Sequence, residues 1–392
     1  MRAAAEPHPP GPSPFQPDAQ FAAEQAALRH VWTMVGTTAD LARDGDWITV
    51  DLWGCPVFIQ RFSDAFRGFV NLCAHRFYPL RIGVKGNGPI RCGFHGWQYD
   101  ADGIAVDIPL CEPLFHMTVQ EMNARLKPVE VAVCGELLFA RLPGVATESL
   151  EEFLADFAPI IARLSLGIGA SVQDHMNVEA SWKFSFHISL DDYHIVAVHP
   201  GTFGAGGHLK PGRYRYFRSG AHSALFSGGD VSDQALERMR IQCADGSYRG
   251  VGYRIFHVFP NLSLLHYLFR GRWYIIVIQH VAAGRQKTLV RNWIYPAAFP
   301  TPPQRFGDLR NRLQDWPRAL LLRYGTRRIL GEDRDVCEAL QTVADHASDR
   351  PRLGGQESRI AWFNVALTRA VAAAGRAESE AAPPRRGSER AR

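Results

Sequence analysis

Two short pairs of cysteine and histidine constrain the fold of this chain more than any other feature. Cys73 and His75 form a Cys-x-His pair, and Cys92 and His95 form a Cys-x-x-His pair that follows shortly after it. Four metal-binding side chains at these spacings predict two neighbouring loops that together hold one metal centre. We therefore expect both pairs to lie in tight turns of a rigid scaffold.

Two kinds of metal centre use two cysteines and two histidines. Zinc modules are tetrahedral and usually group Cys with Cys and His with His. In a Rieske cluster, two thiolates hold one iron and two imidazoles hold the other, so a mixed pair contributes to both irons. Each loop of this chain supplies one residue of each type, which favours a [2Fe-2S] cluster over zinc. Neutral imidazoles raise the potential of such a cluster, which suits an electron relay.

The wider motif resembles that of Rieske non-heme iron oxygenase α subunits, the aromatic ring-hydroxylating oxygenases. Arg76 follows the first His of the motif, and Gly96 and Trp97 follow the second. The resemblance extends through most of the chain and implies an α+β fold. A small all-β Rieske domain is followed by a catalytic domain in which helices flank an antiparallel sheet, the helix-grip or START-like arrangement. The remaining cysteines match no part of the motif and are predicted to be buried small hydrophobic residues: Cys55, Cys111, Cys134, Cys243 and Cys337.

Length and composition fit two domains in a reducing compartment. The 392 residues are 46% hydrophobic, and part of the net charge of +5 lies in an Arg-rich tail. The chain is long enough for more than one core, and its charge gives no reason to expect nucleic acid as a partner. No apolar run approaches membrane-spanning length, and the Pro-rich N-terminus lacks the apolar core of a signal peptide. We expect a cytoplasmic protein, with no membrane association, whose seven cysteines do not form a disulfide framework.

Composition also predicts the domain boundaries. Residues 1–18 and 376–392 are rich in Pro, Ala, Ser and charge, which predicts disorder. Residues 19–144 are predicted to form an N-terminal helix and the Rieske domain, whose short strands close in a hairpin with Gly135 at its turn. Residues 145–375 are predicted to form the catalytic domain, in which helices precede and follow a run of antiparallel strands.

A second metal site is predicted in the catalytic domain. Asp191, His194 and His199 form the pattern D-x-Y-H-x-x-x-x-H, which resembles the iron-ligand segment of the Rieske oxygenases. Two histidines and one carboxylate leave three positions of an iron open for oxygen and substrate. The segment GEDRDVCEALQ resembles the C-terminal Glu-Asp motif of the family, and on that match Asp333 is the carboxylate ligand. The resemblance thus implies a mononuclear iron held by His194, His199 and Asp333.

Alternatives remain open for two residues of this second site, Asp333 and Asp191. Glu332 and Asp335 are weaker candidates for the carboxylate ligand, and Asp333 could instead be an acidic residue favoured by the N-terminus of a helix. Asp191 precedes His194 by three residues, so it faces the same side of a helix and is predicted to accept a hydrogen bond from the imidazole N–H that does not bind iron. The alternative for Asp191 is a solvated helix residue.

The spacing of the two iron-site histidines makes a structural demand. Residues 181–199 are predicted to form one long helix. Residues five apart in a regular α-helix point about 140° away from each other, too far for a shared metal. The helix must therefore end, bend or widen between His194 and His199, and we expect a π-type turn of the kind found at functional sites.

The resemblance also implies partners. In the family, the carboxylate that matches Asp191 bridges to a cluster histidine of a neighbouring subunit. This implies an electron path from His95 of one chain to Asp191 and His194 of the next, and hence a cyclic homo-oligomer, a homotrimer. The chain shows no flavin or nicotinamide fingerprint. A separate reductase, with or without a ferredoxin, is therefore expected to supply electrons from NAD(P)H.

The segment before the iron site departs from the family pattern, and the substrate pocket is poorly defined. Where family members often carry Asn-Trp-Lys and then Glu-Asn, this chain has Ser181-Trp182-Lys183 and then His187-Ile188. Ile188 is predicted to make the pocket drier, and His187 either to hydrogen-bond Asp191 or to be a core histidine. Several aromatic and neutral polar residues either line the pocket or belong to the core: Phe203, Tyr253, His257, Phe259, Asn261, His266 and Tyr267. If they line it, an aromatic or heteroaromatic substrate is favoured, with a quaternary ammonium as the lesser alternative.

The sequence therefore predicts a Rieske oxygenase component. It would use O2 and reductase-supplied electrons to mono- or dioxygenate, or oxidatively demethylate, a small aromatic organic substrate, with one [2Fe-2S] cluster and one mononuclear Fe²⁺ per subunit. One alternative is an electron-transfer protein without oxygenase chemistry, which has no need of the roughly 230 residues after the small domain. The other is a binding protein stabilised by zinc at the Cys/His site.

Overall fold

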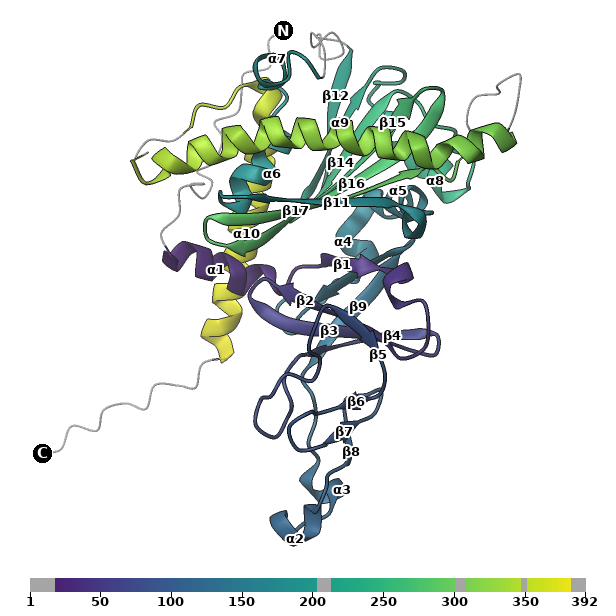
Figure 1. Ribbon diagram of the computed structural model, residues 1–392. Coiled ribbons are helices and arrows are strands. Elements are labelled where there is room, and N and C mark those ends of the chain that lie inside the picture. Colours follow the sequence, from purple (N-terminus) through teal and green to yellow (C-terminus); the bar gives the residue numbers. More distant parts are fainter. Residues whose placement is uncertain (1–17, 203–212, 300–307, 347–350, 382–392) are drawn as a thin grey trace, which may run out of the picture.

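Two antiparallel sheets organise the computed structural model, which describes residues 18–202, 213–299, 308–346 and 351–381. Each sheet has seven strands, and a small three-stranded sheet accompanies them. The small sheet projects from the first sheet, on the side away from the second sheet (Figure 1). Helices cover the second sheet. The predicted α+β fold is confirmed.

The first sheet is formed by the N-terminal part of the chain, in the order β1-β10-β9-β4-β3-β2-β5. The hairpin between β9 and β10 turns at Gly135, as predicted, with φ of +62°. A side chain there would also clash with helix α5 (Ala158–Ser165), because an added Cβ would lie 2.1 Å from the Ser165 hydroxyl. The strands of the first and the small sheet are β1 (Thr33–Thr37), β2 (Asp46–Leu52), β3 (Cys55–Phe62), β4 (Ala65–Val70), β5 (Lys85–Asn87), β6 (Ile90–Arg91), β7 (Gln98–Tyr99), β8 (Ala105–Asp107), β9 (Pro128–Cys134) and β10 (Leu137–Arg141).

The second sheet follows the order β11-β17-β16-β15-β14-β13-β12. Apart from β11, its strands are joined to their neighbours in chain order, so it is largely a meander of antiparallel hairpins. The run of strands predicted after the iron-site segment is confirmed. The strands are β11 (Val172–Val178), β12 (Tyr214–Ser219), β13 (His222–Ser227), β14 (Tyr253–Val258), β15 (Leu262–Phe269), β16 (Arg272–Gly284) and β17 (Lys287–Pro296).

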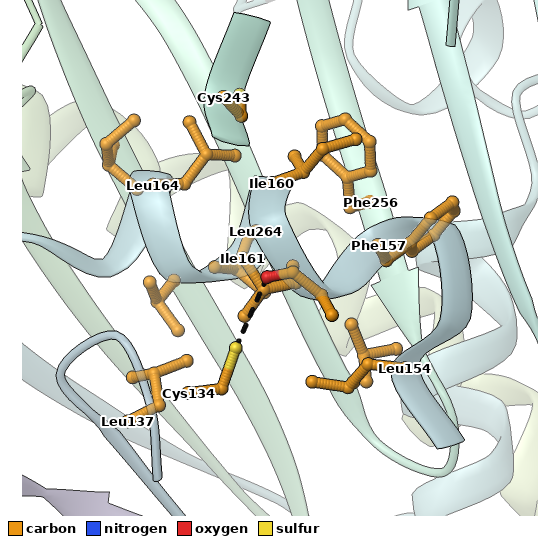
Figure 2. Close-up of a cluster of buried hydrophobic side chains, with 14 of the residues drawn as sticks. Cys134, Leu137, Leu154, Phe157, Ile160, Ile161, Leu164, Cys243, Phe256 and Leu264 are labelled. Carbon is orange, nitrogen blue, oxygen red and sulfur yellow. Dashed lines mark hydrogen bonds between the residues drawn. The ribbon is translucent and has the colours of Figure 1, made fainter. Parts of the chain in front are cut away.

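The main core joins the two sheets. Figure 2 shows Ile160 and Ile161 of α5 between Phe256 of the second sheet and Cys134 of the β9–β10 hairpin. The Cys134 thiol donates to the carbonyl of Ala158 over 3.4 Å. Four of the five cysteines predicted to be small hydrophobic residues are buried, and Cys55 is half-buried. Because one cluster of apolar side chains contacts both sheets, the relative position of the two halves is fixed by packing.

The helices lie around the second sheet. Helix α9 runs across one face of that sheet, and α10 runs beside α1 (Figure 1). The helices are α1 (Asp18–Leu28), α2 (Cys111–Phe115), α3 (Val119–Met122), α4 (Leu150–Leu154), α5 (Ala158–Ser165), α6 (Trp182–Leu190), α7 (Ile195–Val198), α8 (Ala235–Ala244), α9 (Asp308–Val343) and α10 (Ser358–Ala381). The 3₁₀ helices are η1 (Thr38–Leu41), η2 (Ala155–Phe157), η3 (Ile168–Ala170), η5 (Ala344–His346) and η6 (Gly355–Glu357).

Two expectations about the helices and termini need correction. The long helix predicted over residues 181–199 is interrupted, because α6 ends at Leu190 and a separate four-residue α7 follows. At the C-terminus, residues 376–381 continue α10, so the helix runs past the predicted boundary. The segments 1–17 and 382–392, for which disorder was predicted, lie outside the described residues.

Candidate metal centres and cavity

The two Cys/His pairs lie in matching loops. Cys73 lies between β4 and β5, and Cys92 lies between β6 and β7. The N–H of Cys73 donates to the carbonyl of Tyr78 over 2.9 Å, and that of Cys92 donates to the carbonyl of Trp97 over 2.8 Å. Each bond spans five residues, so both loops close in the same way. The predicted tight turns are present, and each presents its cysteine and histidine from one short segment.

The two loops bring their histidines together. The rings of His75 and His95 lie 4.6 Å apart between centroids, and His75 stacks on Trp97 at 4.8 Å with an interplanar angle of 2°. Burial, followed by the positive charges of His95 and Arg76, lowers the pKa of His75. Its Nδ1 atom is buried and has no hydrogen-bond partner among the described residues. A neutral imidazole with an unpartnered nitrogen is the form that binds iron, so this donor set fits a Rieske cluster.

The cysteines of these loops are buried beside a tyrosine. The Sγ of Cys73 lies 3.1 Å from the hydroxyl of Tyr99, and that hydroxyl also accepts the N–H of Ala74 over 3.1 Å. Burial raises the pKa of the Cys73 thiol, so an iron is needed to hold this sulfur as a thiolate. The Tyr99 hydroxyl is placed to donate to the sulfur, a contact that tunes the potential of such clusters.

The iron-site histidines flank the short helix α7. Asp191 follows the end of α6 in an extended conformation, and its Oδ1 accepts the N–H of Tyr193 over 2.7 Å. The chain then turns into α7, which begins after His194 and ends before His199. His199 leaves the helix with φ −114° and ψ +42°. The short helix therefore ends between the two histidines, as the spacing demands, but through a regular α-helical turn, so the expected π-type turn is wrong. The turn capped by Asp191 precedes His194, and the backbone leaves helical geometry again at His199.

Three donor atoms converge at this break. The Nε2 atoms of His194 and His199 are 3.2 Å apart. The Oδ1 of Asp333 lies 3.0 Å from Nε2 of His199 and 3.5 Å from Nε2 of His194. One ligand atom from each of these residues fits within 4.8 Å of the other two. Asp333 lies well inside α9, which begins at Asp308, so the alternative of a helix N-terminal acid is wrong.

The charges at this point suit a cation. Burial acts to lower the pKa of His194, but Asp191 and Asp333 together raise it to about 9. Burial acts to raise the pKa of Asp333, and its contacts with His194 and His199 lower it instead. The carboxylates thus stabilise positive charge on the imidazoles, and a divalent metal supplies that charge more directly. The donor set of two imidazoles and one carboxylate fits iron.

Glu332 hydrogen-bonds one of these histidines at the ring nitrogen that does not face the other donors. The Nδ1–H of His199 donates to Oε2 of Glu332 over 2.7 Å, and the Thr202 hydroxyl donates to the same oxygen over 2.7 Å. A hydrogen bond at Nδ1 leaves the Nε2 lone pair directed toward Asp333 and His194. Glu332 therefore contacts the back of a histidine and is not one of the three converging donors. Asp335 pairs with Arg334 at the surface.

Replacing Glu332 by Gln is expected to weaken iron binding about 10- to 100-fold, because the charged partner that orients His199 is lost. The dissociation constant for Fe²⁺, measured anaerobically by competition with a chelator, checks this. Asp335→Asn is the matched control, since it removes a nearby carboxylate that does not contact the site. Equal affinities in Glu332→Gln and wild type would show that Glu332 plays no part in orienting the histidine.

Asp191 lies close to His194 but does not hydrogen-bond its ring. Its Oδ2 is 3.6 Å from Nδ1 of His194, which is within ion-pair range but longer than a hydrogen bond. Its other oxygen accepts backbone N–H groups of Tyr193 and His194. Asp191 follows the end of α6, so the alternative of a solvated helix residue is wrong. Its side chain both caps the turn and faces the ring of His194.

A buried ion pair anchors the same turn to α10. Oδ2 of Asp192 accepts from Nη2 of Arg359 over 2.6 Å and from the Tyr216 hydroxyl over 2.7 Å. Arg359 is fully buried, and its Nη1 lies 3.2 Å from Nδ1 of His257. Because Asp192 is the next residue after Asp191, this pair sets the position of the turn that carries the histidines. Sequence reasoning missed Arg359, since its partner is 167 residues away.

Arg359→Ala is expected to lower the free energy of unfolding by about 3 to 5 kcal/mol, because it leaves the Asp192 carboxylate buried without its cation. Equilibrium unfolding in urea measures the change. Arg240→Ala is the matched control, since Arg240 pairs with Glu237 at the exposed surface, and no measurable loss is expected there. Equal effects of the two substitutions would contradict a structural role for the buried pair.

His187 belongs to the core. Its ring is buried and packs against Phe363 at 5.3 Å between centroids. Burial, with the nearby charge of Lys183, lowers its pKa to about 3. The alternative of a core histidine is therefore supported. The expected hydrogen bond to Asp191 is not found among the described contacts.

A cavity of about 770 Å³ opens onto the three converging donors. Ile188 lines it, which supports the prediction of a dry wall on that side. Of the residues considered for the pocket, Tyr253 and Tyr267 line it. Four others are buried in the core outside the cavity lining: His257, Phe259, Asn261 and His266. Phe203 lies outside the described residues.

The two candidate metal centres lie at opposite ends of the folded molecule. In Figure 1, strands β6 and β7, which carry the second Cys/His loop, lie at the lower end, and α7 lies at the upper end. The two sheets stand between them. Within one chain, the loops and the iron site are therefore not neighbours.

Two family models match the chain in succession. Residues 31–128 match the Rieske [2Fe-2S] domain. Residues 168–373, more than half of the chain, match the catalytic domain of ring hydroxylating alpha subunits. The chain belongs to this α-subunit family. Its cofactors are accordingly a [2Fe-2S] cluster and a mononuclear iron.

Curated relatives of this α subunit include enzymes with different substrates. The chain is 27% identical over 197 residues to the oxygenase subunit of glycine betaine monooxygenase from Chromohalobacter salexigens, a match that covers 48% of this chain and 43% of that protein. It is 28% identical over 184 residues to the large subunit of anthranilate 1,2-dioxygenase from Acinetobacter baylyi, covering 43% of this chain and 37% of that protein. The chain thus spans less than half the length of these relatives.

Solved structures share the fold over nearly the whole α subunit. Naphthalene 1,2-dioxygenase from Rhodococcus sp. with indole bound matches with a TM-score of 0.68 at 16% identity, covering 91% of this chain and 93% of that one. A quaternary ammonium Rieske monooxygenase that oxidises carnitine matches with a TM-score of 0.66 at 19% identity, covering 92% and 93%. In the described parts of this chain, no helix has both the length and the apolar character needed to cross a membrane.

Proposed function

We propose that this α subunit hydroxylates a small organic substrate with O2 and electrons from a separate reductase. The observation that carries the proposal is the convergence of His194, His199 and Asp333 on the wall of a cavity large enough for a small molecule. A facial set of two histidines and one carboxylate leaves iron positions open on the cavity side. Whether the product is a phenol, a cis-diol or a demethylated compound depends on the substrate.

The cluster ligands in this proposal are the two Cys/His pairs. Cys73 and Cys92 hold one iron, and His75 and His95 hold the other. When bound, the cluster supplies electrons one at a time. The protein contributes the buried thiols, the stacking of His75 on Trp97 and the hydroxyl of Tyr99 beside the sulfur of Cys73. These contacts support a rigid relay.

At the second site, the proposed iron ligands are His194, His199 and Asp333. When bound, this iron supplies the activation of O2. Glu332 fixes the ring of His199 from behind, and the apolar wall with Ile188 keeps bulk water away from the substrate. The site thus combines oriented ligands with a dry space for the reacting carbon.

The electron path in this proposal crosses between subunits of a homotrimer, from His95 of one chain to Asp191 and His194 of the next. His95 lies at the surface, and Phe77 and Phe94 of the two Cys/His loops are 68% and 50% exposed. Beside Asp191, Tyr193 and Val196 are 72% and 65% exposed. Exposed apolar groups around both ends of the path support a contact between copies of the chain.

The reductase and the cellular location are part of the same proposal. Reducing equivalents come from NAD(P)H through a reductase, with or without a ferredoxin. None of the seven cysteines forms a disulfide, which supports a reducing, cytoplasmic location. An electron carrier without chemistry of its own would have no use for the cavity and its three convergent donors.

The proposal is tested by O2 consumption. The purified, iron-loaded protein is supplied with NADH and a surrogate reductase, and a set of small aromatic and heteroaromatic compounds is screened for stimulation. A stimulating compound whose product gains the mass of one or two oxygen atoms, or loses a methyl group, supports the proposal. Cluster reduction without O2 uptake for any compound would favour the electron carrier instead.

A further inference from the structure

A buried histidine faces the cavity from the sheet. Residues Ile276, Ile278 and His280 alternate along β16 and all line the cavity. Since every second side chain of a strand points to the same face, these three share the cavity face of the sheet. On the neighbouring strand β17, Val290 pairs with His280 and also lines the cavity. His280 is thus a polar group placed within an apolar row.

The imidazole of His280 is held by one partner, and its other nitrogen is buried without one. The Ser185 hydroxyl lies 2.8 Å from Nδ1 of His280, and Ser185 also lines the cavity. His280 is only 3% exposed, and its Nε2 has no hydrogen-bond partner among the described residues. Burial lowers the pKa of His280 to about 4, so the ring is neutral near pH 7. A buried polar atom without a partner costs free energy unless a ligand supplies one.

Aliphatic side chains make up much of the remaining wall. Five further residues from α6, α7 and the sheet line the cavity with aliphatic side chains: Val178, Ile188, Ile195, Ile255 and Leu265. Asp192 also lines it, but its charge is paired with Arg359. Four aromatic residues also line it: Tyr253, Tyr267, Phe269 and Tyr324. Of these, Tyr267 and Tyr324 are 40% and 71% exposed. A quaternary ammonium needs either a free carboxylate or a close aromatic cage, and the residues beside His280 on the sheet, Ile278 and Val290, provide neither.

We infer that the cavity binds an uncharged, mostly hydrocarbon molecule whose one polar group hydrogen-bonds Nε2 of His280. The inference rests on the proposed function, in which the cavity is the substrate site, and it names the class of substrate. The hydrocarbon part fills the apolar wall, and His280 fixes which end of the molecule faces away from the surface. Ser185 acts through His280 as a positioning residue, because it holds the ring in one orientation.

Binding of a matched pair of probes tests the inference without turnover. The anaerobic holoenzyme, with no reductase present, is titrated by calorimetry with 2-indanol and with indane, which differ by one hydroxyl. In His280→Leu, the dissociation constant for 2-indanol is expected to rise about tenfold, because the hydroxyl loses its partner. The constant for indane is expected to stay the same or to fall. Ser185→Ala is expected to weaken 2-indanol binding in the same direction but less.

His266→Phe is the control variant. His266 lies on the same sheet but packs in the main core against Trp273, and its Nε2 lies 2.8 Å from the Tyr248 hydroxyl. In His266→Phe, the ratio of the dissociation constants for 2-indanol and indane is expected to equal the wild-type ratio. Thermal unfolding identifies a variant that does not fold, and Ser185→Ala then provides the comparison.

Several outcomes would overturn the inference. These are an unchanged ratio in both His280→Leu and Ser185→Ala, tighter binding of benzyltrimethylammonium than of either probe, and no binding of either probe up to its solubility. Iron content and O2 uptake are measured on the same samples. A protein that takes up O2 but shows no His280-dependent ratio refutes this inference and leaves the oxygenase proposal intact.

Discussion

Replacing His199 by alanine is expected to abolish substrate turnover while the [2Fe-2S] cluster stays in place. His199 contributes one of three donor atoms, and its Nε2 lies 3.0 Å from Asp333. Removing it leaves two protein ligands, whereas the iron site needs all three to hold the metal. The visible absorption of the cluster and its acid-labile sulfide should not change, because the Cys/His loops lie at the other end of the folded molecule (Figure 1). Iron per chain should fall by one.

His175→Ala is the matched control for this substitution. His175 is an exposed histidine on β11 and does not contact the three donors, so its removal should leave iron content and turnover at wild-type levels. Full iron content in His199→Ala, or loss of sulfide together with iron, would mean that the two metal centres are not the separate sites proposed.

The second large effect is expected for Asp191→Asn. An asparagine keeps the oxygen that caps the turn, where Asp191 accepts the N–H of Tyr193, but removes the charge that faces His194. The mononuclear iron should therefore remain bound, while turnover falls about 100-fold, in the range seen when a partner of a metal-binding histidine is lost. In single-turnover experiments, the reduced cluster should fail to reoxidise in the presence of O2 and substrate. Reoxidation at the wild-type rate would remove Asp191 from the electron path.

Mixed oligomers test whether this path crosses between subunits. Cys92→Ser removes a cluster ligand and His199→Ala removes an iron ligand, so each variant alone should be inactive. When the two are coexpressed and assemble together, the intact cluster of one subunit lies beside the intact iron site of the next, and part of the activity should return. Mixed oligomers without any activity would indicate a path within one chain.

The cluster loops could be predicted from sequence because the information is local. Each Cys/His pair lies within four residues, and a tight turn is a property of a short segment. The predicted hairpin at Gly135 and the strands of the second sheet followed from turn residues and apolar runs, which are equally local. The elements that carry these residues could therefore be predicted from short segments of the sequence.

The iron site was predicted less completely because its geometry depends on distant partners. The break before His194 is set by the Asp191 cap and by Arg359, a residue of the C-terminal helix that the spacing does not reveal. Glu332 was weighed as a ligand, and only its 2.7 Å contact with Nδ1 of His199 shows its place behind the ring. A short motif marks the residue types but not which atom each one faces.

The cavity residues were the hardest to predict. Strand alternation assigns Tyr253 and Tyr267 to one face of the sheet, but His257 shares that alternation and is buried away from the cavity beside Arg359. His280 was overlooked, although it continues the alternating row after Ile276 and Ile278. The alternation along a strand tells which face of the sheet a residue lies on. Whether that residue lines a cavity or is buried in the core depends on which helices cover that face.

The most direct test of two separate metal centres in one chain is the metal and sulfide content of the protein purified without oxygen. The proposal predicts a brown protein with about three irons for every two acid-labile sulfides, two of them in the cluster and one at His194, His199 and Asp333. Equal amounts of iron and sulfide, or a colourless protein that contains zinc and no sulfide, would contradict it.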